Sequence, residues 1–195
     1  MEPPAQQGKI VHDRPPMLAI GIMIWLGSEL MFFSGLFAAF FTIRAAAPGG
    51  VWPPAGTDLD TIRAGIFTLI LVSSSFTMQW AVHQEEYRNR ASARKWIAVT
   101  IVLGFAFIAN QAYEWKYFPT RPGTNAYGSL FFIMTGLHGL HVFLGLVAMV
   151  FLLGRLKGRS AGDPGELSVV QGVSYYWHFV DIVWVGLYSC LFLLK

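Results

Sequence analysis

Apolar residues occupy five long runs of the chain, and within each run they cover every face of a helix rather than one stripe. The runs are residues 17–44, 63–84, 95–117, 126–154 and 169–194. Each is longer than the roughly 18 residues needed to cross a hydrocarbon core. Alternating segments of about ten residues, typical of a membrane β-barrel, are missing from the sequence. The pattern therefore predicts an all-α fold, a polytopic membrane bundle of five transmembrane helices.

The composition agrees with a membrane protein. Hydrophobic residues make up 54% of the 195 residues and charged residues 13%, with a mean hydropathy of +0.49. Soluble domains carry about 25% charged residues. The basic residues are scattered among the connections rather than clustered, which argues against a nucleic-acid partner. The single cysteine, Cys190, excludes a disulfide framework and a cysteine-rich metal site.

The connections between the runs are short and rich in turn-forming residues, so none can hold a second domain. We expect a cytoplasmic N-terminal segment over residues 1–16 and a single five-helix domain over residues 17–195. An odd number of spans places the two termini on opposite sides of the membrane. Nine Lys and Arg residues fall on the N-terminal side and five on the other. The positive-inside rule then predicts a cytoplasmic N-terminus.

Five ionisable side chains fall inside the predicted spans: Glu29, His138, His141, His178 and Asp181. A charge within the membrane costs at least ~2.5 kcal/mol, so such groups normally face the bundle interior and find partners. At 1.5 Å per residue, Glu29 lies about 18 Å into the first span, close to the midplane. We therefore expect these five groups to form a buried polar layer, with Glu29 and Asp181 accepting imidazole hydrogens.

The histidines admit two interpretations. His138 and His141 share a helix face, and His178 would supply a third ligand to a metal ion. Alternatively, all three form hydrogen bonds between helices that approach closely at small residues. We favour packing, and we predict no catalytic, cofactor-binding or metal site in this chain. The residues expected to pack the helices together are Gly136, Gly139, Gly145, Trp177 and Trp184.

Basic side chains in the turns on the N-terminal side have two explanations. They act as topology signals, or they contact anionic lipid head groups. Arg155 and Lys157 are the candidates for head-group contacts.

At six stretches, in the family's order, the sequence resembles subunit III of the haem–copper cytochrome c oxidases. The stretches are residues 25–33 (WLGSELMFF), 52–54 (WPP), 111–114 (QAYE), 127–129 (YGS), 135–142 (TGLHGLHV) and 176–184 (YWHFVDIVW). The last two are highly specific when they occur together. The family's long form has seven spans, so this chain resembles the short five-helix form found in bacteria.

The resemblance implies an accessory core subunit of the respiratory oxidase that reduces oxygen to water with proton pumping in aerobic electron transport. Such a subunit is a multi-pass protein of the bacterial plasma membrane. It carries no redox centre, because haem and copper belong to partner subunits. It packs on the catalytic subunit I, contacts other oxidase subunits and membrane lipid, and supports proton uptake and active-site stability. A bound phospholipid is compatible with the resemblance, and the family's intramembrane glutamate matches Glu29.

Other functions fit parts of the pattern. The equivalent subunit of a quinol oxidase or nitric oxide reductase shares much of it, although residues 28–33 and 52–54 favour the cytochrome c branch. An independent small membrane carrier using Glu29 and Asp181 would need inverted repeats or broken helices, which the sequence lacks. A di-haem electron carrier would use His138, His141 and His178 as ligands.

Overall fold

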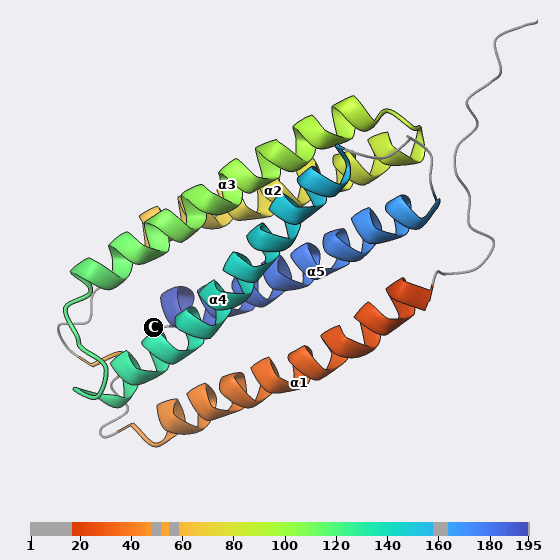
Figure 1. The fold of residues 1–195 in the computed structure, drawn as a ribbon. Helices are drawn as coiled ribbons and strands as arrows, with labels where there is room; N and C mark the ends of the chain where they lie inside the picture. Colours follow the sequence, from red (N-terminus) through yellow and green to blue (C-terminus); the bar gives the residue numbers. More distant parts are fainter. Residues whose placement is uncertain (1–16, 48–51, 55–58, 158–163, 195) are drawn as a thin grey trace, which may run out of the picture.

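Five long helices run in alternating directions in the computed structural model, which describes residues 17–47, 52–54, 59–157 and 164–194 (Figure 1). They are α1 (Met17–Ala45), α2 (Thr61–Glu86), α3 (Arg90–Tyr117), α4 (Ala126–Arg155) and α5 (Pro164–Tyr188). A short π-helical turn, η2 (Ser189–Leu193), continues α5. All five helices are long and apolar enough to cross a membrane, which confirms the predicted fold class.

The helices extend beyond the apolar runs where polar residues cap them. α3 begins at Arg90 rather than at residue 95, because the Asn89 side chain accepts a hydrogen bond from the backbone N–H of Ser92. α2 begins at Thr61, where Asp60 accepts from the backbone N–H of Arg63. α5 begins at Pro164 rather than at residue 169. Hydropathy thus locates the membrane-embedded part of each helix, and capping residues locate the starts of α2 and α3.

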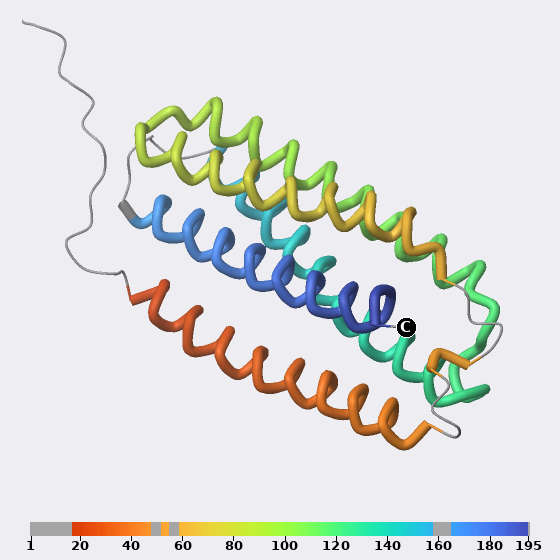
Figure 2. The backbone as a smooth tube through the Cα atoms, turned by 180° about the vertical axis from the view of Figure 1, so that it is seen from behind, coloured from red at the N-terminus to blue at the C-terminus, as the bar shows by residue number. Residues whose placement is uncertain are grey.

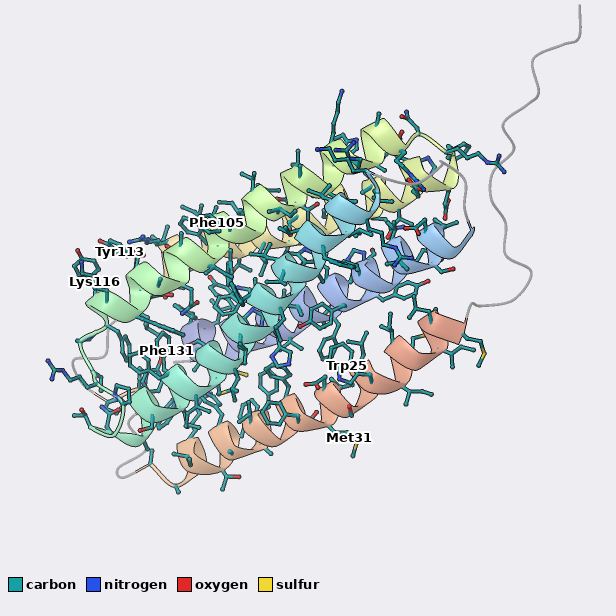
Figure 3. The ribbon with its side chains drawn as sticks, in the orientation of Figure 1. Trp25, Met31, Phe105, Tyr113, Lys116 and Phe131 are labelled. Carbon is teal, nitrogen blue, oxygen red and sulfur yellow. The ribbon has the colours of Figure 1, made fainter. Side chains whose placement is uncertain are left out.

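The helices are arranged around α5. Seen from behind, α5 lies between α1 and α2, while α3 and α4 cover the opposite side (Figure 2). α1 packs chiefly on α5, and its buried residues are Ala19, Phe33 and Phe40. Trp25 points from α1 toward the bundle and Met31 points away from it (Figure 3). α1 is therefore the least enclosed helix of the five.

Two tryptophans of α5 form the centre of the bundle. The ring of Trp177 lies so close to Gly104 of α3 and Gly145 of α4 that an added Cβ would come within 2.8 and 2.9 Å of it. Its indole N–H donates to Ser74 Oγ of α2 over 2.8 Å. One side chain thus joins four helices, and only glycine leaves room for it at the two close approaches.

Trp184, two turns further along α5, repeats this arrangement. Its indole N–H donates to Thr68 Oγ1 of α2 over 2.9 Å. The ring packs edge-on against Phe107 of α3 and stacks on His138 of α4, with centroids 4.7 and 4.9 Å apart. The two indoles together set the position of α2, α3 and α4 relative to α5.

The Trp177 packing predicts opposite effects for two glycines of α4. Gly145→Ala should lower the free energy of unfolding by about 1–3 kcal/mol, because the new methyl group collides with a buried ring. Gly139→Ala is the matched control: nothing lies within 4 Å of its added Cβ, so better helix propensity should stabilise it by about 0.5–1 kcal/mol. Unfolding in detergent, followed by circular dichroism, measures both; equal effects at the two positions would contradict the packing described.

Candidate functional site

Glu29 and His141 form a polar pair between α1 and α4. Glu29 Oε2 lies 3.1 Å from His141 Nε2, and the two side chains are 22% and 12% exposed. The other ring nitrogen, Nδ1, lies 2.7 Å from the backbone oxygen of Leu137. Phe33 packs edge-on against the imidazole, and the Tyr176 hydroxyl donates to the backbone oxygen of His141. The pair thus lies within the spans, and apolar and aromatic groups surround it.

The hydrogen-bond geometry determines how many protons the pair holds. A backbone oxygen only accepts, so His141 Nδ1 carries a hydrogen. The contact between Nε2 and Glu29 then requires one more proton. That proton lies either on the imidazole, facing a carboxylate, or on the carboxyl group, facing a neutral ring. The pair is electrically neutral in both forms, which lowers the cost of placing a glutamate within the membrane.

A second group of polar residues, the α2–α5 cluster, comprises Ser75, Gln79, His178 and Asp181. Ser75 donates to Asp181 Oδ2, and its oxygen lies 3.0 Å from His178 Nδ1. His178 Nε2 lies 3.3 Å from Gln79 Oε1. A serine thus stands between the imidazole and Asp181. Direct contact between a carboxyl group and an imidazole, expected for both acids, occurs at Glu29 and not at Asp181.

The three histidines lie in separate environments. His138 is buried between the rings of Phe107 and Trp184, and neither of its ring nitrogens has a hydrogen-bond partner among the described residues. His141 contacts Glu29, while His178 belongs to the α2–α5 cluster. In the described ranges, no three His, Cys, Asp or Glu side chains are arranged to hold a metal ion. The ligand set considered from the sequence is therefore not assembled there.

The residues expected to pack the helices together differ in how close the side chains of neighbouring helices come to them. Trp177 and Trp184 are buried, and Gly145 contacts the Trp177 ring directly. Gly136 lies beside Trp115, which an added Cβ would meet at 3.7 Å, and Gly139 faces open space within this chain.

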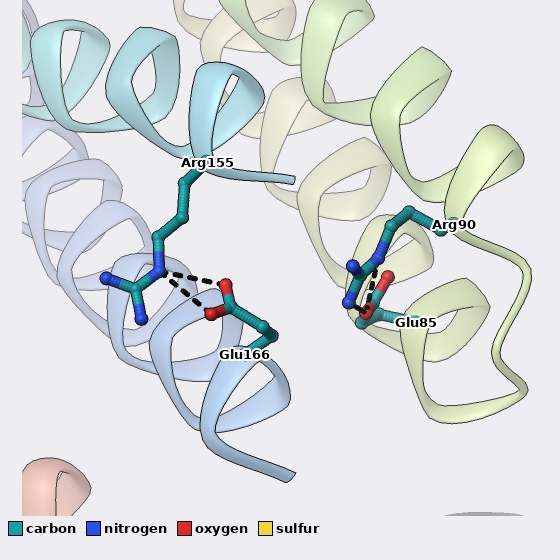
Figure 4. A network of polar contacts seen from close by, with 4 residues as sticks. All are labelled: Glu85, Arg90, Arg155 and Glu166. Carbon is teal, nitrogen blue, oxygen red and sulfur yellow. Dashed lines mark hydrogen bonds and ion pairs between the residues drawn. The ribbon is translucent and has the colours of Figure 1, made fainter. Parts of the chain in front are cut away.

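Two ion pairs lie at the end of the bundle where α2 and α4 end and α3 and α5 begin (Figure 4). Arg90 lies 2.6 Å from Glu85, and Arg155 lies 2.8 Å from Glu166; both carboxylates are fully buried. Arg155, a candidate for lipid contact, thus contacts a carboxylate of its own chain, whereas Lys157 is exposed. Two basic residues of these turns, Arg90 and Arg155, thus hold the chain together through ion pairs.

Sequence reasoning missed several contacts between helices and at the helix ends. It did not identify Glu85 and Glu166 as partners of arginines, nor Ser74, Ser75 and Gln79 as partners of α5. The run of three serines, residues 73–75, inside an otherwise apolar span is the sequence feature that could have indicated hydrogen bonds from α2 to a neighbouring helix.

Comparison with known proteins identifies one family. Residues 6–194 match the model of the family described as cytochrome c oxidase subunit III. A Nocardia farcinica protein named "Probable cytochrome c oxidase subunit 3" is 47% identical over 186 residues, which cover 94% of this chain and 91% of that protein. A Mycobacterium tuberculosis protein of the same name is 45% identical with the same coverage. "Cytochrome c oxidase subunit 3" of Corynebacterium diphtheriae is 41% identical over 98% of this chain and 95% of its own length.

The proton count of the Glu29–His141 pair predicts different outcomes for two substitutions. Glu29→Gln should change the free energy of unfolding by less than about 0.5 kcal/mol, because the amide can donate to Nε2 of a neutral ring. Glu29→Ala leaves that nitrogen without a partner and should cost about 1–3 kcal/mol. Thermal unfolding of the purified variants compares them, and a loss for Gln as large as that for Ala would contradict this account of the contact.

Proposed function

Since this chain belongs to the cytochrome c oxidase subunit III family and is an accessory subunit of that haem–copper oxidoreductase complex, we propose that it packs directly on catalytic subunit I. The observation that carries the proposal is the family match, which extends over nearly the whole chain. The alternative functions are not favoured, because the similar proteins are named for this one subunit.

The chain is a multi-pass membrane protein, and we propose that it lies in a bacterial plasma membrane, since its named relatives are bacterial. The nine basic residues on the N-terminal side support a cytoplasmic segment over residues 1–16, ahead of the single five-helix domain. Haem and copper would lie in partner subunits, and Lys157 is available to lipid head groups.

The role we propose is support of proton uptake and of active-site stability, without a catalytic step in this chain. The Glu29–His141 contact supports it, because a proton can move between carboxyl group and imidazole without changing the net charge of the pair. A neutral pair can hold a proton within the membrane at low cost.

Purification of the tagged chain in mild detergent tests the proposal. We expect haem absorption in the visible spectrum and co-purification of the catalytic subunit, identified by mass spectrometry. An oxidase assembled without this chain should begin at normal activity and then lose it during sustained turnover. Glu29→Gln cannot transfer a proton but should keep the fold, so this variant should be retained in the complex. It therefore separates proton support from assembly. A colourless preparation from cells that make the oxidase would refute membership of the complex.

A further inference from the structure

Exposed hydroxyl groups in the membrane-spanning helices form hydrogen bonds within their own helices. Ser28, Ser34, Thr42 and Ser73 each donate to a backbone oxygen three or four residues earlier. A hydroxyl satisfied in this way can face lipid without an external partner.

Gln79 is an exposed polar residue of a different kind. It lies on α2, seven residues before the helix ends at Glu86, which places it about 10 Å inside that end. Its amide offers two donor hydrogens and an acceptor oxygen. Within the described residues its hydrogen-bond contact is the single one to His178. The remaining capacity of the amide faces outward, where lipid chains cannot satisfy it.

The α2–α5 cluster determines what Gln79 presents to the outside. Ser75 uses its hydrogen to donate to Asp181, so its oxygen accepts from His178 Nδ1–H. In the structure the Gln79 amide oxygen faces Nε2. When the ring is neutral, Nε2 accepts and the amide turns to donate an N–H to it. Rotation about the last side-chain torsion allows this. In either orientation of the amide, at least one N–H donor is left facing away from the bundle.

Large exposed side chains lie on α2 and α5 at positions near Gln79 and His178; these two helices run side by side in Figure 2. Phe76 of α2 and Ile182 of α5 are 74% and 71% exposed, and Tyr175 is also exposed. We call Phe76, Gln79, Tyr175, His178 and Ile182 the α2–α5 face. It combines exposed aromatic and apolar area with a hydrogen-bonding group, the composition found at the centre of protein interfaces.

The outer sides of α3 and α4 lack such a group. Phe105 of α3, which points outward in Figure 3, and Phe151 of α4 are 67% and 69% exposed. The exposed neighbours of these residues on their own helices include Val102, Leu144 and Val147. These sides are suited to lipid, whereas the α2–α5 face is suited to protein.

We propose that the α2–α5 face binds a transmembrane helix of another oxidase subunit, and that a hydroxyl or amide side chain on that helix hydrogen-bonds to Gln79. The inference rests on the proposed function, since it takes the chain to be one subunit of a complex. It adds the surface used and the chemistry of the partner.

Photo-crosslinking in the assembled complex tests the surface. A benzophenone side chain is introduced at residue 76 or 182, and at residue 105 or 151 as equally exposed controls. We expect adducts with an identified oxidase subunit from positions 76 and 182, at least about tenfold above those from positions 105 and 151. Adducts with that subunit mainly from the control positions, or only lipid or a second copy of this chain from positions 76 and 182, would overturn the inference.

Substitution of Gln79 tests the hydrogen bond. Gln79→Leu should reduce retention of the chain in the complex about threefold after detergent washing, the usual strength of a hydrogen bond between transmembrane helices. Ser73→Ala, on the same helix, should leave retention unchanged. Equal retention of Gln79→Leu and wild type would exclude a bond at Gln79. If the wild-type chain fails to co-purify with any oxidase subunit, the proposed function itself is wrong; if it co-purifies but crosslinks from the control positions, only this inference fails.

Discussion

Indole N–H groups inside a membrane need acceptors that lipid cannot supply, and the arrangement of this bundle follows from how α5 satisfies two of them. Trp177 and Trp184 donate to Ser74 and Thr68, which fixes how α2 lies along α5. The Trp177 ring then requires space on its other sides, and Gly104 provides it on α3. Gly145 does the same on α4. Satisfying two hydrogen bonds therefore sets the relative positions of four helices.

α1 is held differently, and this matters for the site. Its buried surface is small, and its contacts with the bundle combine aromatic packing, such as the Trp25 ring stacked on Tyr176, with the Glu29–His141 pair. Because His141 lies on α4, which the indoles of α5 hold in place, the imidazole is the fixed partner and Glu29 is carried by the more exposed helix. The pair thus joins the enclosed part of the bundle to its least enclosed helix.

Much of the fold could be predicted from the sequence, because the thickness of the bilayer imposes long apolar helices and makes intramembrane polar groups conspicuous. The rest depends on which neighbour each residue meets. Ser73 and Ser74 both donate to backbone oxygens of their own helix, but only Ser74 also accepts from Trp177, and nothing in the sequence separates the two. Gly139 and Gly145 look alike in the sequence, yet only the second contacts a ring. The Asp181 contact was likewise misassigned, because a serine intervenes.

The central claim is that the indole-to-hydroxyl bonds of α5 organise the bundle, and a double-mutant cycle tests it most directly. Trp177→Phe and Ser74→Ala are made singly and together, and the free energy of unfolding is measured in detergent. Because the volume lost at Trp177 cancels in the cycle, the account predicts a coupling of roughly 0.6–1.7 kcal/mol. The cycle with Ser73→Ala in place of Ser74→Ala should show none. Additive effects of Trp177→Phe and Ser74→Ala would contradict the account.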